Sequence, residues 1–199
     1  MRTIARIIGL LSLLPLFAVA AETAPDALVK STVEEVLAVL KDTKDKRKLV
    51  ELAEQKVLPH FDFEEMTRLA VGRAWRDATD AQKKALVNEF RTLLVHTYTA
   101  ALAQAAKGDQ KVEVKPARVQ PGQKEVVVRT VVKQPGSPPI PIDYSMHRTP
   151  SSWKVYDVIV DNLSLVTNYR GTFNAEVAKG GIDGLIKSLA EKHHKIAGS

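Results

Sequence analysis

The residues best suited to chemistry lie close together at His60, Asp62, Glu64 and Glu65. An imidazole and three carboxylates at this spacing are groups that bind divalent metal ions. The same residues also suit the start of a helix, because Asp is a strong N-cap and acidic side chains in the first turn stabilise the helix dipole. We therefore expect Asp62 to cap a helix over 63–71, and we expect no metal site.

The motifs of several enzyme classes are missing from the sequence, which contains no HExxH, GxSxG, P-loop or GxGxxG. The absence of cysteine also excludes thiol catalysis and thiolate metal sites. The glycine-rich segment 180–184 follows an expected helix and not a strand, which favours a helix break over a phosphate cradle. His96 and His147 have no nucleophile near them in the sequence. We predict that the chain is not an enzyme, has no catalytic residues and needs no cofactor.

One pair of opposite charges lies within apolar segments. Asp157 falls inside an expected strand, and Arg170 follows Tyr169 in an expected helix. We expect these two side chains to form a structural ion pair that fixes the helix against the sheet.

Apolar residues at helical spacing predict helices over 24–40 and 45–57, before the helix over 63–71. Thr79 and Gln82 form a capping box that predicts the start of a long helix, which ends at about residue 106. Two more helices are expected at the end of the chain, over 163–179 and 182–195, separated by Gly180 and Gly181.

The pattern changes to a period of two between these helices. Alternation at Val112 and Val114 and over 125–133, 140–146 and 153–160 predicts an antiparallel meander of about four strands, with the last strand at 153–160. The strand at 125–133 has valines on both faces, so we expect both faces to be covered. Helices, then strands, then helices indicate an α+β fold.

The first twenty residues have the features of a signal peptide. Arg2 and Arg6 form a basic n-region, residues 7–17 are an apolar run too short to span a bilayer, and Ala18-Val19-Ala20 is a typical cleavage site. We expect cleavage after Ala20, export, and one domain over 21–199. Without Arg2 and Arg6, 27 basic residues face 23 acidic ones, and the basic residues are mostly scattered. This pattern does not favour a nucleic-acid partner.

With these residues considered together, the chain resembles the MlaC family of phospholipid-binding proteins, also called toluene-tolerance auxiliary proteins. The resemblance covers nearly all of the expected mature chain. The matching blocks are VLPHFDF at 57–63, Gly72, Trp75, ATDAQ at 78–82, Phe90, Tyr98, WKVYDV at 153–158, SLV at 164–166, NYR at 168–170, Phe173 and the segment 181–189. Asp161-Asn162 stands where a Glu-Gly-like turn is expected, and Asn tolerates the left-handed conformation that such a turn needs.

The resemblance implies a curved antiparallel sheet packed against helices, with an apolar slot for the acyl chains of a glycerophospholipid between them. It also implies a periplasmic carrier that maintains outer-membrane lipid asymmetry. Such a carrier exchanges phospholipid between an outer-membrane lipoprotein complex and an inner-membrane ABC transporter with an MCE-domain subunit.

The slot should be lined by apolar positions on adjacent strands and on the helix that covers them. These candidate lipid-binding residues are Val128, Val132, Ile142, Tyr144, Met146, Tyr169 and Phe173. Two alternatives remain open at this point. A lipid-free periplasmic adaptor or chaperone would keep the fold and fill the slot with side chains, and a periplasmic hydrolase would need a polar cluster that the sequence does not reveal.

Overall fold

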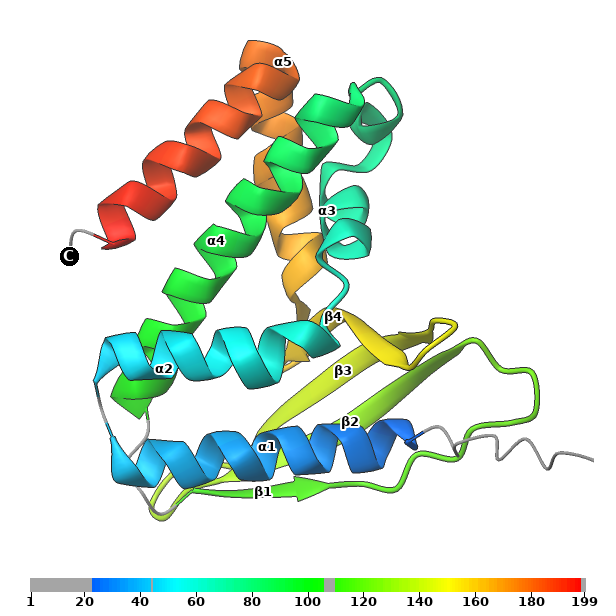
Figure 1. Ribbon diagram of the computed structural model, residues 1–199, viewed down its shortest axis with the longest axis vertical. Helices are drawn as coiled ribbons and strands as arrows, with labels where there is room; N and C mark the ends of the chain where they lie inside the picture. Colours follow the sequence, from blue (N-terminus) through cyan, green and yellow to red (C-terminus); the bar gives the residue numbers. More distant parts are fainter. Residues whose placement is uncertain (1–22, 44, 106–109, 198–199) are drawn as a thin grey trace, which may run out of the picture.

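The computed structural model describes residues 23–43, 45–105 and 110–197 (Figure 1). The expected signal peptide over 1–20 lies outside the described residues. Helices come first, an antiparallel sheet follows, and a long bent helix ends the chain. The α+β fold expected from the sequence is confirmed.

The chain begins with two helical segments. Helix α1 (Pro25–Asp42) has proline in its first turn, where no intrahelical N–H is needed. Helix α2 (Lys46–Leu52) is capped by Asp45, which accepts a hydrogen bond from the backbone N–H of Arg47 at 2.9 Å. The chain then continues through a π-helical turn, η1 (Ala53–Val57), and a 3₁₀ turn, η2 (Leu58–His60), because Pro59 has no N–H to continue an α-helix.

The capping residue predicted from the sequence determines where the next helix begins. Asp62 caps α3 (Phe63–Val71) by accepting a hydrogen bond from Glu65 N at 2.9 Å. Helix α3 ends at Gly72, whose φ of 66° favours glycine, and the chain enters the 3₁₀ helix η3 (Gly72–Arg76).

The capping box is also confirmed. Gln82 N donates to Thr79 Oγ1 at 3.2 Å, and Thr79 N donates to Gln82 Oε1 at 3.0 Å. Helix α4 (Asp80–Ala105) follows directly, close to the predicted span.

The sheet is an antiparallel meander with the strand order β1-β2-β3-β4-β5. The five strands are β1 (Lys111–Val114), β2 (Glu125–Lys133), β3 (Ile140–Arg148), β4 (Trp153–Val160) and β5 (Leu163–Ser164). Strand β5 was not predicted from the sequence, since two residues are too few to show an alternating pattern. A two-residue turn joins β4 to β5, and both turn residues have positive φ, 48° at Asp161 and 65° at Asn162. Such φ values match the twist of a tight hairpin, and Asn and Asp tolerate them.

Two sequence expectations about the sheet are wrong. Strand β2 is packed on one face only, with Val126, Val128 and Thr130 buried while Val127 is 43% exposed. An antiparallel sheet needs only one covered face, so β-branched residues also occupy the open one. Asp157 does not pair with Arg170 among the described interactions. It accepts hydrogen bonds from Ser164 Oγ at 2.6 Å and Val166 N at 3.0 Å, so it fixes the start of the last helix without the arginine.

Helix α5 (Leu165–Ala197) consists of two arms. The expected break is confirmed at Gly181, whose φ of 67° and ψ of −165° are not helical. Figure 1 shows that the second arm turns back from the first, with α4 beside both.

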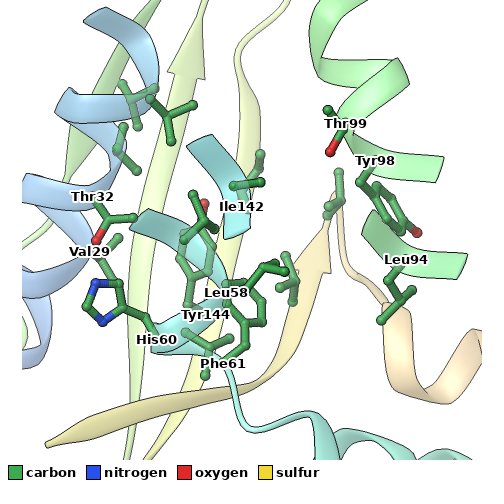
Figure 2. Close-up of a pocket in the computed structure, with 18 of the residues that line it drawn as sticks. Val29, Thr32, Leu58, His60, Phe61, Leu94, Tyr98, Thr99, Ile142 and Tyr144 are labelled. Atoms are coloured by element: carbon green, nitrogen blue, oxygen red, sulfur yellow. The ribbon is translucent and has the colours of Figure 1, made fainter. Parts of the chain in front are cut away.

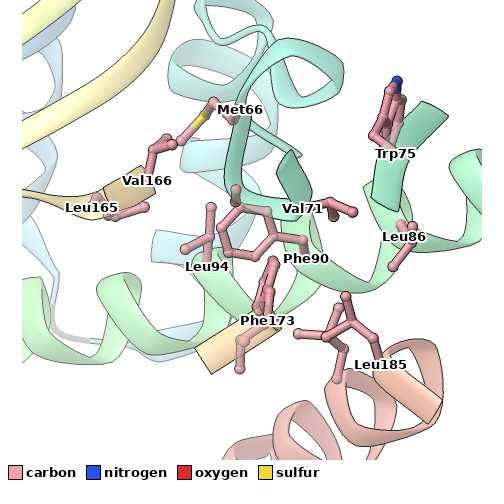
Figure 3. Close-up of a cluster of buried hydrophobic side chains, with 13 residues drawn as sticks. Met66, Val71, Trp75, Leu86, Phe90, Leu94, Leu165, Val166, Phe173 and Leu185 are labelled. Atoms are coloured by element: carbon pink, nitrogen blue, oxygen red, sulfur yellow. The ribbon is translucent and has the colours of Figure 1, made fainter. Parts of the chain in front are cut away.

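The described core is divided into separate clusters. The largest lies among α3, α4 and α5, where the rings of Phe90 and Phe173 pack edge-on with their centroids 5.0 Å apart (Figure 3). The Tyr169 ring packs edge-on against Phe90 in the same cluster, with a centroid distance of 4.9 Å. A second cluster lies between α1 and the sheet and includes Val128 and Trp153. The space between these clusters forms the candidate site.

Candidate functional site

An apolar cavity of about 490 Å³ lies between α1, the segment from α2 to η2, the C-terminal half of α4 and one face of the sheet (Figure 2). Its lining residues are Leu28, Val29, Thr32, Val33, Val36, Leu37, Leu40, Leu49, Leu52, Ala53, Val57, Leu58, His60, Phe61, Phe63, Met66, Leu94, Val95, Tyr98, Thr99, Gln110, Val112, Val132, Gln134, Ile140, Ile142, Tyr144, Met146, Val155, Val158, Val160 and Leu165. None of these residues is Asp, Glu, Lys or Arg. The volume falls within the range of about 300–1,000 Å³ that is typical of small-molecule sites.

Helix α1 forms one wall of the cavity through the face that the sequence marks as apolar. Six apolar residues at helical spacing, which we call the α1 stripe, line the cavity: Leu28, Val29, Val33, Val36, Leu37 and Leu40. The spacing of three and four residues places these side chains on one side of the helix. This stripe therefore faces a cavity and not only a packed core.

The sheet forms the opposite wall through residues of one face. Val132 pairs with Ile140, Ile142 pairs with Val160, and the Tyr144 ring lies beside them on the central strand β3. Because side chains alternate along a strand, every second residue of β3 reaches the cavity. The register shift opposite Ser145 and Met146 lies in β4, so β3 keeps its alternation through Met146 while the lining residues of β4 step from Val158 to Val155.

The structure brings together four of the seven candidate lipid-binding residues. Val132, Ile142, Tyr144 and Met146 line the cavity, and the other three do not. Val128 is on the same face of the sheet, but it is 0% exposed and packs in the cluster with Val29 and Trp153.

Tyr169 and Phe173 belong to the helical cluster, because the first arm of α5 packs on α3 and α4 and does not cover the sheet strands β2 and β3. These two aromatic residues were predicted to line the cavity because they are apolar and share one helix face, but that face packs against other helices. The walls from α1 and from the segment α2 to η2 were not predicted, because the apolar stripe of α1 is visible in the sequence but does not distinguish a cavity wall from a packed core.

Two tyrosine hydroxyls near the cavity are held by hydrogen bonds. Tyr98 lines the cavity and is hydrogen-bonded to Tyr169, and burial together with Tyr98 raises the pKa of Tyr169 to about 12. Burial also raises the pKa of Tyr144, which is hydrogen-bonded to Thr130. The phenols of Tyr169 and Tyr144 are therefore neutral near pH 7 and act as polar, uncharged groups.

The histidine at the cavity, His60, interacts electrostatically with both Lys154 and Glu35, and burial has the largest effect on its pKa. Burial, with a further contribution from Lys154, lowers the pKa of His60, so its imidazole is neutral at neutral pH. The nearest histidine–carboxylate pair is His147 with Asp62, whose Nε2 and Oδ2 atoms are 3.0 Å apart, and neither residue lines the cavity. Among the described residues, no group of three His, Cys, Asp or Glu side chains is placed to hold a metal ion.

The cavity opens where three of its lining residues are exposed. Tyr98, Ile140 and Val160 are 39%, 45% and 37% exposed, and they come from α4 and from neighbouring ends of β3 and β4. Gln110 and Gln134 add amide groups to the lining, near the start of β1 and the end of β2. The arrangement is an apolar interior with uncharged polar groups at an open end.

Comparison with known families decides the classification, because the model of the MlaC protein family matches residues 30–191. The chain belongs to the MlaC family. The matched segment includes most of α1, the whole sheet and most of α5, so the MlaC match covers every wall of the cavity.

Two MlaC relatives carry descriptions that bear on function. The toluene tolerance protein Ttg2D of Pseudomonas putida is 28% identical over 180 residues, which cover 87% of this chain and 82% of the relative. A phospholipid-binding protein from Ralstonia solanacearum, solved in complex with a phospholipid, is 35% identical with a TM-score of 0.80. That match covers 88% of this chain and 99% of the solved one. No described helix of the present chain is long and apolar enough to span a bilayer.

Proposed function

We propose that this protein binds a phospholipid in the cavity and carries it between membranes. The observation that carries the proposal is the cavity of about 490 Å³, whose lining contains no charged side chain. The phospholipid complex of the Ralstonia solanacearum relative supports the same reading, since its fold matches with a TM-score of 0.80.

The size of the cavity argues for an apolar occupant. At about 24 cal/mol per Å³, an unfilled apolar cavity of this volume would cost up to about 12 kcal/mol. That cost is comparable with the whole free energy of unfolding of a typical domain, about 5–15 kcal/mol. Acyl chains would offset it, because each methylene removed from water contributes about 0.8 kcal/mol, or roughly 24 kcal/mol for two chains with about 30 methylenes.

The open end gives the proposed orientation of the lipid. The acyl chains lie between α1 and the sheet, and the headgroup lies near Tyr98, Gln110 and Gln134, where polar lining meets solvent. Uncharged polar groups solvate the ester region without requiring one headgroup charge. In this orientation Val132, Ile142, Tyr144 and Met146 contact acyl chains.

The proposed cellular role follows from family membership and the N-terminal sequence. Residues 1–20 are a signal peptide, residues 21–199 form a single lipid-binding domain, and the carrier works in the periplasm. It exchanges glycerophospholipid with an outer-membrane lipoprotein complex and with an inner-membrane ABC transporter that has an MCE-domain subunit. This exchange maintains the lipid asymmetry of the outer membrane, and it involves no catalysis by the carrier.

A transfer assay tests the proposal and separates it from the two alternatives. Donor vesicles containing a fluorescent phospholipid are mixed with unlabelled acceptor vesicles, with and without the protein. A carrier accelerates the appearance of intact labelled lipid in the acceptors. Release of free fatty acid would instead indicate a hydrolase, and an unchanged transfer rate would indicate a lipid-free adaptor.

A further inference from the structure

A second concave surface lies away from the cavity lining, between α3, η3 and the first arm of α5. This groove, which we call the arginine groove, has a volume of about 670 Å³. It is lined by Arg68, Leu69, Gly72, Arg73, Trp75, Arg76, Arg170 and Asn174. Half of the lining residues are arginines and none is acidic, so the groove concentrates positive charge from α3, η3 and α5 on one concave surface.

The fold gathers these arginines from separate elements. The positive φ of Gly72 turns the chain from α3 into η3, where Arg73 and Arg76 are three residues apart and therefore share one side of the 3₁₀ helix. Arg170 reaches the groove from α5, and its Nε donates a hydrogen bond to the carbonyl oxygen of Leu69 at 2.9 Å. The groove is thus built by packed elements and not by one run of charge.

Most of the charge in the groove has no acidic partner. Arg68 is paired with Glu65, whose two carboxylate oxygens accept from Nε at 2.7 Å and from Nη2 at 2.5 Å. Arg73, Arg76 and Arg170 form no ion pair with any described residue, and all three are exposed. Three guanidinium groups therefore remain available to an external anion.

We propose that the arginine groove binds an acidic segment of a partner protein. Guanidinium groups form paired hydrogen bonds with carboxylates, and several in one concave surface select a run of Asp or Glu side chains over isolated charges.

The lack of an exposed large apolar side chain in the groove favours a protein partner over a membrane surface. Peripheral membrane sites combine basic residues with exposed apolar anchors. The aromatic residue of the groove, Trp75, is only 9% exposed. The exposed large apolar side chains of the described chain lie elsewhere, at Tyr98, Val127, Ile140, Val160 and Leu163.

The groove and the cavity use different sides of α3. Phe63 and Met66 contribute to the cavity lining, whereas Arg68 and Leu69 contribute to the groove. The exposed residues Tyr98, Ile140 and Val160 of the cavity do not belong to the groove lining. The groove and the cavity share no lining residue, so the proposal about the groove does not depend on what the cavity binds.

Charge reversal tests the groove directly. Binding of a fluorescein-labelled oligo-glutamate peptide is measured by fluorescence anisotropy at low and physiological ionic strength. The double variant R73E/R76E should bind at least about tenfold more weakly than the wild type, with a smaller dependence on salt. The matched control R118E/K124E changes the net charge equally at two exposed residues outside the groove, and it should lose no more than about twofold.

Three outcomes would overturn the proposal. Equal losses in the two double variants would mean that net charge alone attracts the peptide. No binding by the wild type would mean that the groove does not recognise carboxylates. Binding of phosphatidylglycerol vesicles that depends on Arg73 and Arg76, without peptide binding, would assign the groove to a membrane surface. The milder variant R73Q/R76Q, checked by circular dichroism, repeats the comparison if charge reversal disturbs folding.

Discussion

Replacing Ile142 by Trp should fill part of the cavity. Ile142 lies on the central strand β3 and lines the cavity between its partners Thr130 and Val160. Trp has about six more heavy atoms than Ile, and these atoms would displace roughly four to six methylenes of an acyl chain. At about 0.8 kcal/mol per methylene the loss is roughly 3–5 kcal/mol, or about two to three orders of magnitude in lipid affinity. The stability of the lipid-free protein should change little, because the new atoms enter existing space.

Replacing Val128 by Trp is the matched control, and the structure predicts the opposite pattern. Val128 is on the same face of the sheet but is 0% exposed and packed against its neighbours. Overpacking a filled site costs about 1–3 kcal/mol, which lowers the Tm of a domain of this size by roughly 2–12 °C. Lipid binding by the folded fraction should persist.

Both variants should be compared as delipidated proteins, because a bound ligand raises apparent stability by itself. Thermal unfolding gives the Tm, and titration with a fluorescent phospholipid gives the affinity. An Ile142→Trp protein that binds lipid as tightly as the wild type would refute our placement of the acyl chains. A Val128→Trp protein with an unchanged Tm and no lipid binding would show that the slot extends to Val128.

The remaining predictions concern single groups. Because burial raises the pKa of Tyr169 from 10.0 to about 12, the stability that its neutral form contributes is present below pH 10 and is lost as the pH rises toward 12. Tyr169→Phe should therefore reduce the loss of Tm between about pH 10 and 12, and an unchanged loss would argue against a buried phenol. Thr79→Ala should lower the free energy of unfolding by about 1 kcal/mol in urea, since it removes the cap of α4, and no change would contradict the capping box. His60→Ala should leave phospholipid transfer largely intact, because the proposed carrier needs no catalytic residue and the lowered pKa of His60 leaves its imidazole neutral, and loss by orders of magnitude in a folded variant would reopen the hydrolase interpretation. N-terminal sequencing of exported protein should begin at Ala21, and a protein retaining Met1 would contradict the signal peptide.

The sequence predicts those parts of the fold that local chemistry determines. The cap at Asp62, the box at Thr79 and Gln82, and the break at Gly181 each depend on neighbouring residues, and the structure has all three. Strand β5 was missed because its two residues are defined by pairing with β4 and not by their own pattern.

The candidate site was only partly predictable, because a cavity forms where apolar faces of helices and of the sheet do not pack against each other. Strand alternation selected Ile142 and Tyr144, which line the cavity, but Tyr169 and Phe173, selected from a helical stripe, pack against Phe90 instead. An apolar stripe reads the same whether it faces side chains or a cavity, so the α1 wall could not be recognised without the positions of its neighbours. The arginine groove was equally hidden, because Arg170 lies about a hundred positions from Arg68, Arg73 and Arg76 in the sequence.

Native mass spectrometry of the purified protein tests the central claim most directly. If the cavity holds a phospholipid, the gently desolvated protein should carry one added mass equal to a phospholipid, and fragmentation should release its fatty acids. Ile142→Trp should reduce that adduct while Arg118→Glu, a change outside the cavity, should keep it. A protein that shows only its own mass under conditions that preserve non-covalent complexes, and that takes up no lipid from vesicles, would contradict the account.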